Sequence, residues 1–103
     1  MLIPLLFNNP VFRDDVNLTV RRGSKWIKAW FESGESMSFT LVDKDYKILT
    51  VQYTRFIDLN KELLCFEHDP ICRTYEGLLQ VMKETYPGFT ETEYVTQLYF
   101  KAM

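Results

Sequence analysis

The sequence predicts an α+β fold, in which a small mixed or antiparallel β-barrel carries one main helix and one or two short helices. Apolar and polar residues alternate with a period of two, as in half-buried strands, over residues 16–21, 36–42, 46–55 and 94–101. A later segment shows the helical period of about 3.6 residues. Its apolar stripe consists of Tyr75, Leu78, Leu79, Met82 and Tyr86.

Length and composition predict a single domain over residues 1–103. With 47% hydrophobic residues the chain is too apolar to be disordered. A chain of 103 residues is also long enough to form a hydrophobic core without disulfides or bound metal ions. The apolar opening is interrupted by Pro4, and no run approaches the roughly 18 residues of a membrane span. We therefore expect a cytoplasmic protein with no membrane partner. Cys65 and Cys72 are expected to be free and buried, although their proximity in sequence leaves a disulfide open.

The first predicted strand is preceded by an irregular segment, residues 1–12, which contains Asn8-Asn9-Pro10 and is expected to form a short edge strand or an approach to the core. In the strand itself the apolar positions alternate with polar ones. Thr19 and Arg21 therefore share the face opposite the apolar one, where they hold a hydroxyl and a guanidinium on a stiff element.

A first helix is predicted directly after this strand, with Ser24 as a candidate cap for the segment KWIKAWF. Trp26 and Trp30 are four residues apart, which places both indoles on one helix face. Two interpretations remain open. The indoles fill the core or cover a barrel end, or one of them stacks on a flat heterocycle.

A hairpin and the main helix follow. The turn Asp43-Lys44-Asp45 joins the second and third strands, and residues 56–64 are expected to form a short helix or turn. The main helix is expected over residues 74–85, after capping signals at Asp69-Pro70 and Thr74 and before the stop at Tyr86-Pro87-Gly88. A short loop then leads to the closing strand.

Charge is nearly balanced overall but unevenly distributed. The net charge of −2 argues against tight binding to long nucleic acid through phosphate neutralisation alone. Residues 13–28 carry five bases and two carboxylates, whereas residues 58–93 carry eight carboxylates and three bases. Either a basic edge faces an acidic one, or both segments simply form a solvated surface. Five cations are candidates for holding a phosphate or a base edge: Arg21, Arg22, Lys25, Arg55 and Arg73.

The polar elbow before the main helix holds the only histidine, in the order Glu67, His68, Asp69. A histidine flanked by carboxylates can act as a general acid or base near neutral pH, but the same residues can form an ordinary capping elbow. Cys65, His68 and Cys72 fall short of the four ligands that structural zinc normally takes. We therefore predict no metal site and no cofactor.

Two blocks of sequence resemble a known family. A strand that ends in basic residues, NLTVRR, and the late block LLQVMKETYPGFTETEYVTQLYF are similar to the ASCH domain, a branch of the PUA-like superfamily. This resemblance implies a small PUA-like β-barrel with helices beside a cleft that binds RNA or a nucleotide-like ligand. One branch of the family, the bacterial N4-acetylcytidine amidohydrolase, has this size and removes an acetyl group from a modified cytidine.

The early motif of the family, Gly-x-Lys-x-x-Glu-or-Thr-x-Arg, is half present. Thr19 and Arg21 match it, whereas Asp14 stands at the glycine position and Val16 at the lysine position. In the amidohydrolase branch the lysine, the threonine and a later glutamate form the catalytic group. As a nucleophile, Thr19 would need an adjacent base, for which the chain offers Lys25, His68 or Glu67.

The sequence thus predicts a domain that binds RNA, a nucleotide or a modified nucleoside between the first core strand and the polar elbow. The expected ligand contacts are Thr19, Arg21, Arg22, Lys25, Trp26, Tyr53, Arg55 and Arg73, with Trp26 or Tyr53 as the stacking surface. One alternative is a small amidohydrolase that acts on an acylated nucleoside through Thr19, Glu67 and His68. A further alternative is a protein-interaction module.

Overall fold

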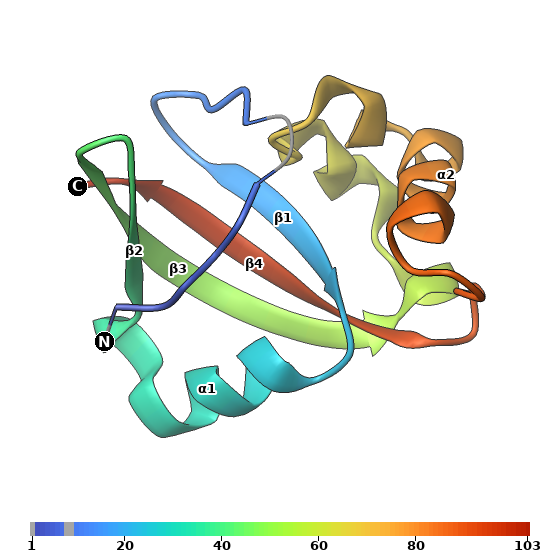
Figure 1. Ribbon diagram of the computed structural model, residues 1–103, viewed down its shortest axis with the longest axis horizontal. Coiled ribbons are helices and arrows are strands. Elements are labelled where there is room, and N and C mark those ends of the chain that lie inside the picture. Colours follow the sequence, from blue (N-terminus) through green and yellow to red (C-terminus); the bar gives the residue numbers. More distant parts are fainter. Residues whose placement is uncertain (1, 8–9) are drawn as a thin grey trace.

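A four-stranded antiparallel sheet that curls into a half-barrel organises the chain (Figure 1). The computed structural model describes residues 2–7 and 10–103, apart from the side chain of residue 35. In spatial order the strands are β1 (Asn17–Arg22), β4 (Tyr94–Ala102), β3 (Lys44–Arg55) and β2 (Ser38–Leu41). The four predicted strands are therefore confirmed, and all pairings are antiparallel.

The hairpin between β2 and β3 is tighter than predicted. Leu41 pairs with Lys44, so the loop holds only Val42 and Asp43, which have φ angles of 49° and 62°. Two consecutive left-handed residues are the geometry of the two-residue hairpin turns that match strand twist. Further along β3 the register shifts between Ile48 and Thr50, and such a bulge bends the strand and helps the sheet to curl.

Two α-helices and several short 3-10 helices complete the described structure. The α-helices are α1 (Lys25–Ser33) and α2 (Tyr75–Thr85). The 3-10 helices span Gly34–Ser36, Phe56–Asp58, Lys61–Phe66 and Pro70–Arg73. No helix in the described part of the chain has the length and apolar character needed to cross a membrane.

The predicted caps have different outcomes. The Thr74 hydroxyl accepts a hydrogen bond from the Gly77 N–H at 3.1 Å and so caps α2. The Asp69 carboxylate accepts from the Ile71 N–H at 3.0 Å and caps the preceding 3-10 turn. Ser24 occupies the cap position of α1, but its side chain makes no capping bond there.

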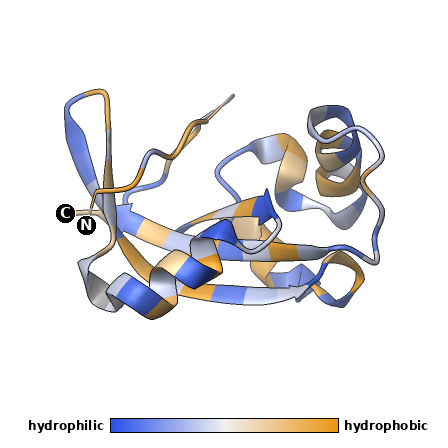
Figure 2. Ribbon diagram, turned by 60° about the horizontal axis from the view of Figure 1, so that its bottom comes forward, coloured by the Kyte–Doolittle hydropathy of each residue, from blue (hydrophilic) through white to orange (hydrophobic). Residues whose placement is uncertain are grey.

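A hydrophobic core lies on each face of the sheet, and apolar and polar residues alternate along the strands (Figure 2). On one face β1 and β4 pack against α2 and the neighbouring 3-10 helices through Leu18, Val20, Val95, Tyr99, Phe56, Leu64, Leu78, Met82 and Phe89. On the other face the sheet packs against α1 and the N-terminal segment through Ile3, Leu5, Ile27, Met37, Phe39, Ile48, Val51, Leu98 and Phe100, with Trp26 and Trp30 partly buried beside them. The prediction that β1 is half-buried was wrong, because Asn17 is 0% exposed and Thr19 only 1%.

The outer edge of β1 is partly covered by the polar elbow. Leu18 forms a parallel bridge with Glu67, and the Leu18 carbonyl accepts the His68 N–H at 3.0 Å. The His68 carbonyl in turn accepts the Val11 N–H at 3.1 Å, which places the N-terminal segment beside the elbow. The N-terminal segment also forms a β-bridge from Leu2 to Ser38, as expected of a segment at the edge of the sheet. The predictions that concern residues 1, 8 and 9 lie outside the described residues.

The first turn of α2 presses closely on the preceding 3-10 helix, and Gly77 makes this approach possible. A Cβ at Gly77 would lie 1.9 Å from the Ile71 carbonyl oxygen, so an added methyl group would collide with backbone. Gly77→Ala should gain about 1 kcal/mol in helix propensity. The collision should cost more, on the order of 1–3 kcal/mol, as overpacking usually does.

We therefore expect Gly77→Ala to lower the urea midpoint of unfolding. Lys83→Ala, at an exposed position of the same helix, should change the free energy of unfolding by less than about 0.5 kcal/mol. A Gly77→Ala variant as stable as the wild type would contradict the close packing of α2 on this turn.

Candidate functional site

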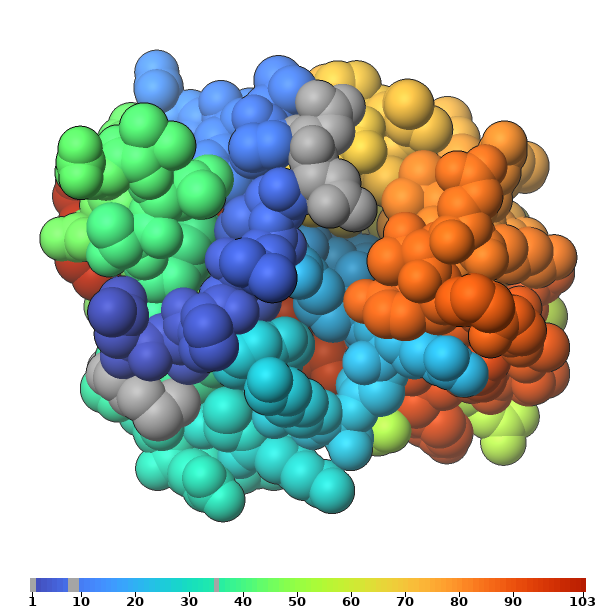
Figure 3. Space-filling model, viewed as in Figure 1, coloured from blue at the N-terminus to red at the C-terminus, as the bar shows by residue number. Residues whose placement is uncertain are grey.

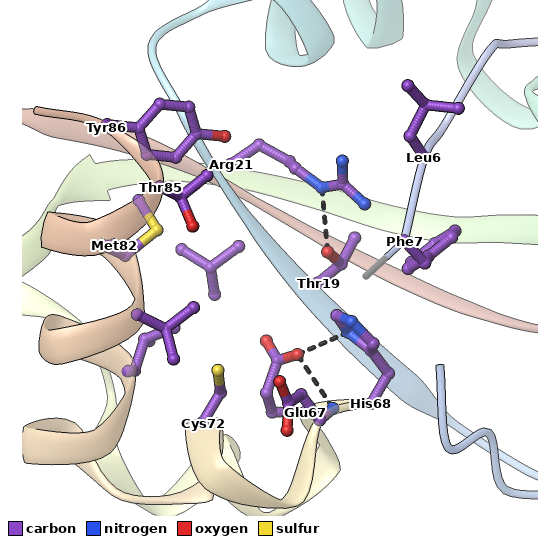
Figure 4. Close-up of a pocket in the computed structure, with 14 residues that line it drawn as sticks. Leu6, Phe7, Thr19, Arg21, Glu67, His68, Cys72, Met82, Thr85 and Tyr86 are labelled. Atoms are coloured by element: carbon purple, nitrogen blue, oxygen red, sulfur yellow. Dashed lines mark hydrogen bonds and ion pairs between the residues drawn. The ribbon is translucent and has the colours of Figure 1, made fainter. Parts of the chain in front are cut away.

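A pocket of about 90 Å³ lies where β1, the polar elbow, α2 and the N-terminal segment meet. Figure 3 shows the surface hollowed at the centre of this face, between the N-terminal segment in dark blue, α2 in orange and the β1–α1 region in cyan. The lining side chains are drawn in Figure 4. They belong to Leu6, Phe7, Thr19, Val20, Arg21, Glu67, His68, Asp69, Cys72, Leu78, Val81, Met82, Thr85 and Tyr86.

Glu67 is the most deeply buried charged residue of the pocket, with 1% of its surface exposed. Its Oε1 atom accepts the Asp69 N–H at 3.2 Å and pairs with His68 Nδ1. Its Oε2 atom is buried and has no hydrogen-bond partner among the described residues. A buried oxygen without a partner loses its hydration uncompensated, so Oε2 is a ready acceptor for a donor that enters the pocket.

His68 is held in one tautomer by its neighbours. Its Nδ1 atom lies 3.1 Å from the Leu18 carbonyl oxygen and also pairs with Glu67 Oε1. Both partners are acceptors, so Nδ1 carries a proton, and Nε2 is the nitrogen that can accept a proton from elsewhere. The Phe7 ring meets the imidazole edge to face, with 4.9 Å between ring centroids.

Arg21 and Thr19 lie above Glu67 and His68 in the view of Figure 4. Arg21 Nε donates a hydrogen bond to Thr19 Oγ1 at 3.0 Å, and the guanidinium carbon lies 4.9 Å from the centroid of the Phe7 ring. Burial lowers the pKa of Arg21, while nearby Tyr86 and Glu67 act in the opposite direction. Guanidinium remains a cation at neutral pH despite such shifts, so the pocket holds a fixed positive charge opposite the Glu67 carboxylate.

The backbone of β1 also contributes to the pocket. In an antiparallel pair, alternate residues turn their N–H and C=O groups toward the partner strand and the others turn them away. The Leu18 carbonyl accepts a hydrogen bond from the His68 N–H of the elbow, so the backbone groups of Leu18 point away from β4. Those of Val20, two residues further along, point the same way, and Val20 lines the pocket. The outer edge of β1 therefore presents one donor and one acceptor of Val20 toward the pocket.

The predicted site residues divide into two groups. Thr19, Arg21, Glu67 and His68 come together in the pocket, from β1 and the elbow. The others lie outside its lining. Arg22 pairs with Glu93 at 2.7 Å, the Lys25 ammonium lies 4.7 Å from the centroid of the Trp26 ring, Tyr53 stacks on Tyr94, and Arg55 lies over Tyr94. Arg73 donates from Nε to the Glu67 carbonyl at 2.9 Å and so fixes the elbow backbone.

The resemblance assigned a lysine to the position of Val16, whose apolar side chain packs against the core on the α2 side. Lys25 does not take the place of that lysine, because it lies outside the pocket lining. In the described structure no hydrogen bond joins Thr19 to Lys25, His68 or Glu67, and the Thr19 hydroxyl instead accepts from Arg21. Thr19 therefore lacks the adjacent base that a threonine nucleophile needs.

Sequence reasoning missed two aromatic residues of the pocket, Phe7 and Tyr86. The helical period predicts that Tyr86 belongs to the apolar stripe of the main helix, whereas its place one residue beyond α2 lets its ring line the pocket. Phe7 lies in a segment without periodicity, so no local signal placed it beside His68 and Arg21.

Both cysteines are free, as expected, but only Cys72 is buried, and the expectation that Cys65 is buried was wrong. Cys65 lies in the last turn of the Lys61–Phe66 helix, on its solvent side, while its backbone carbonyl accepts from Arg13. Burial raises the pKa of the Cys72 thiol to about 12, with help from Glu67 and Asp69. In the described structure no group of three or more His, Cys, Asp or Glu side chains is placed to hold a metal ion.

Alkylation with iodoacetamide at pH 8 tests this environment, because only the thiolate reacts readily. We expect one adduct, on Cys65, and no adduct on Cys72 in the folded protein. Above the ordinary thiol pKa of 9.0, the unfolded chain loses a proton that the folded chain retains up to about pH 12. Cys72 should therefore lower the free energy of unfolding as the pH rises from 9.0 to about 12. Modification of Cys72 as fast as Cys65 under native conditions would contradict the burial.

The site is thus defined by its own geometry: a buried carboxylate with one free oxygen, an oriented imidazole, a guanidinium and an open strand edge. No family model matches the chain, and neither a curated protein nor a solved structure is significantly similar to it.

Proposed function

We propose that this chain is an ASCH-type, PUA-like domain that binds a nucleobase in the pocket at the outer edge of β1, as part of RNA, a nucleotide or a modified nucleoside. The observation that carries the proposal is the buried Oε2 atom of Glu67, which lacks a hydrogen-bond partner among the described residues. An oxygen in this state favours a ligand that brings an N–H donor into the pocket.

The chemistry of the lining supports a base over other donors. A carboxylate is a suitable acceptor for the exocyclic amino group of a base such as cytosine. Arg21 offers donors for a base carbonyl oxygen, and the edge of β1 offers one donor and one acceptor at Val20. Phe7 and Tyr86 supply aromatic surface for a flat ring.

The size of the pocket favours a ring rather than a whole nucleotide. Sites for drug-sized ligands usually measure about 300–1,000 Å³. The volume of about 90 Å³ at the edge of β1 is far smaller, so a sugar and a phosphate would remain outside. A base carried on a longer molecule meets this condition.

The order of elements supports the family assignment. Thr19 and Arg21 lie on one face of the first strand, and the late block forms α2, the Tyr86-Pro87-Gly88 stop and the central strand β4. The curled sheet with helices beside a pocket is consistent with the barrel-like fold that the resemblance implies. Val16 at the lysine position supports binding over the amidohydrolase activity.

A second candidate, hydrolysis of an acylated nucleoside, is favoured by one observation, the pairing of Glu67 with His68. With Nδ1 oriented by Glu67, Nε2 could accept a proton from the water that attacks the acyl carbonyl and return it to the amine nitrogen as the C–N bond breaks, which releases the carboxylic acid and the free nucleoside. This route would use Thr19 as a ligand contact rather than as the nucleophile.

Thermal unfolding with a panel of nucleosides tests the proposal. We expect cytidine and adenosine, which carry amino groups, to raise the melting temperature more than uridine and inosine. A ligand at one hundred times its Kd should add about 2.7 kcal/mol to the free energy of unfolding. Glu67→Gln should abolish the difference between the two classes, because an amide nitrogen then replaces one of the two acceptor oxygens.

Glu62→Gln is the matched control, since Glu62 is exposed and lies outside the pocket lining. It should respond to the ligands as the wild type does. Equal responses to all four nucleosides in the wild type, or an unchanged preference in Glu67→Gln, would contradict the proposal. Mass analysis of the same samples with N4-acetylcytidine separates the two candidates, since only the hydrolase would release the acetyl group.

A further inference from the structure

Two tyrosines outside the pocket form an exposed aromatic pair. Tyr53 on β3 and Tyr94 on β4 stack with ring centroids 5.0 Å apart and an interplanar angle of 24°. They remain 38% and 45% exposed, respectively. The guanidinium carbon of Arg55 lies 5.7 Å from the centroid of the Tyr94 ring. A flat aromatic surface beside a cation, open to solvent, is suited to base stacking.

The strand register places this pair on the same face of the sheet as Thr19 and Arg21. Arg21 and Tyr53 both pair with Thr96, so all three side chains lie on one face of the sheet. With neighbouring strands about 4.8 Å apart, the backbones of Arg21 and Tyr53 are separated by roughly 10 Å across the sheet. The aromatic pair therefore lies within the reach of a ligand that occupies the pocket.

Gly23, just beyond β1, lies between Arg21 and the tyrosine pair. The Gly23 N–H donates to the Tyr94 carbonyl at 3.0 Å, which continues the pairing beyond β1 and puts Gly23 beside Tyr94. A Cβ at Gly23 would meet no atom within 4 Å, so the space next to the Gly23 α-carbon is open. Thr96, which separates Arg21 from Tyr53, is fully buried, and its hydroxyl donates to the Gly23 carbonyl at 2.6 Å.

The charges along this strip favour an anionic partner. Arg21 lies at the pocket end and Arg55 at the tyrosine end, while Lys25 begins α1 two residues after Gly23. The Glu93 carboxylate at this end is paired with Arg22 at 2.7 Å. Flat rings joined by phosphates match both features, whereas an apolar peptide would match only the tyrosines.

We propose that Tyr53, Tyr94 and Arg55 form a stacking platform for a second base of a single-stranded nucleic acid whose first base occupies the pocket. This inference rests on the proposed nucleobase function of the pocket. It goes beyond that function by assigning a second base-binding surface, outside the pocket, to the exposed end of β3 and β4.

Binding of cytidine monophosphate and of a cytidine tetranucleotide should be measured at low salt for the wild type, Tyr53→Ala and Tyr94→Ala. We expect the wild type to bind the tetranucleotide at least tenfold more tightly than the mononucleotide. Each alanine variant should lose about tenfold in tetranucleotide affinity, as removal of one base–aromatic stack does, and should keep its mononucleotide affinity. Tyr53→Phe should retain the binding of both.

Phe31→Ala is the matched control, because Phe31 is an exposed aromatic residue on α1 outside the strip. It should bind both ligands as the wild type does. Melting temperatures of all variants would confirm that they fold, as expected for exposed side chains.

Tetranucleotide binding that is unaffected in Tyr53→Ala and Tyr94→Ala, with mononucleotide binding intact, would overturn the platform and leave the pocket function standing. If the wild type binds neither the mononucleotide nor the tetranucleotide, both proposals are overturned. Self-association that is lost in Tyr53→Ala while tetranucleotide affinity stays unchanged would assign the patch to protein contact and overturn the platform as well.

Discussion

The buried carboxylate of Glu67 is the group on which the rest of the site depends. Taking a carboxylate out of water costs several kcal/mol unless neighbours supply hydrogen bonds or opposite charge. Glu67 Oε1 receives such partners from His68 and the Asp69 N–H, whereas Oε2 has none in the described structure. The elbow is held in this position by its backbone, because the His68 N–H bonds to Leu18 and the Arg73 guanidinium bonds to the Glu67 carbonyl.

The same contacts solve the problem of an open sheet edge. Edge strands present unpaired backbone groups that invite unwanted pairing, and proteins commonly cover them. Here the elbow covers the edge of β1 at Leu18, while the edge at Val20 faces the pocket. Because Arg21 lies on this strand and pairs with the same β4 residue as Tyr53, the proposed stacking platform lies on the same face of the sheet as Arg21. The architecture and the proposed recognition site thus depend on one strand.

Local periodicity predicted the elements well and the long-range contacts poorly. Alternation placed Thr19 and Arg21 on one face of β1, and the helical period placed α2 within one residue of its observed bounds. Alternation could not predict that the polar face is also buried. Asn17 is buried because it bonds locally, accepting the Arg13 N–H at 2.7 Å. The pairing of His68 with Leu18 joins residues 50 apart in sequence, and the position of Phe7 beside His68 has no sequence signature at all.

The most direct measurement is the ring nitrogen NMR spectrum of His68, the only histidine in the chain. We predict a proton on Nδ1, because both partners of that atom are acceptors. We also predict that cytidine shifts the ring signals in a saturable way, and that this response disappears in Glu67→Gln. A proton on Nε2 instead of Nδ1, or ring signals that stay constant while cytidine binds, would contradict the assignment of the site to the Glu67–His68 pocket.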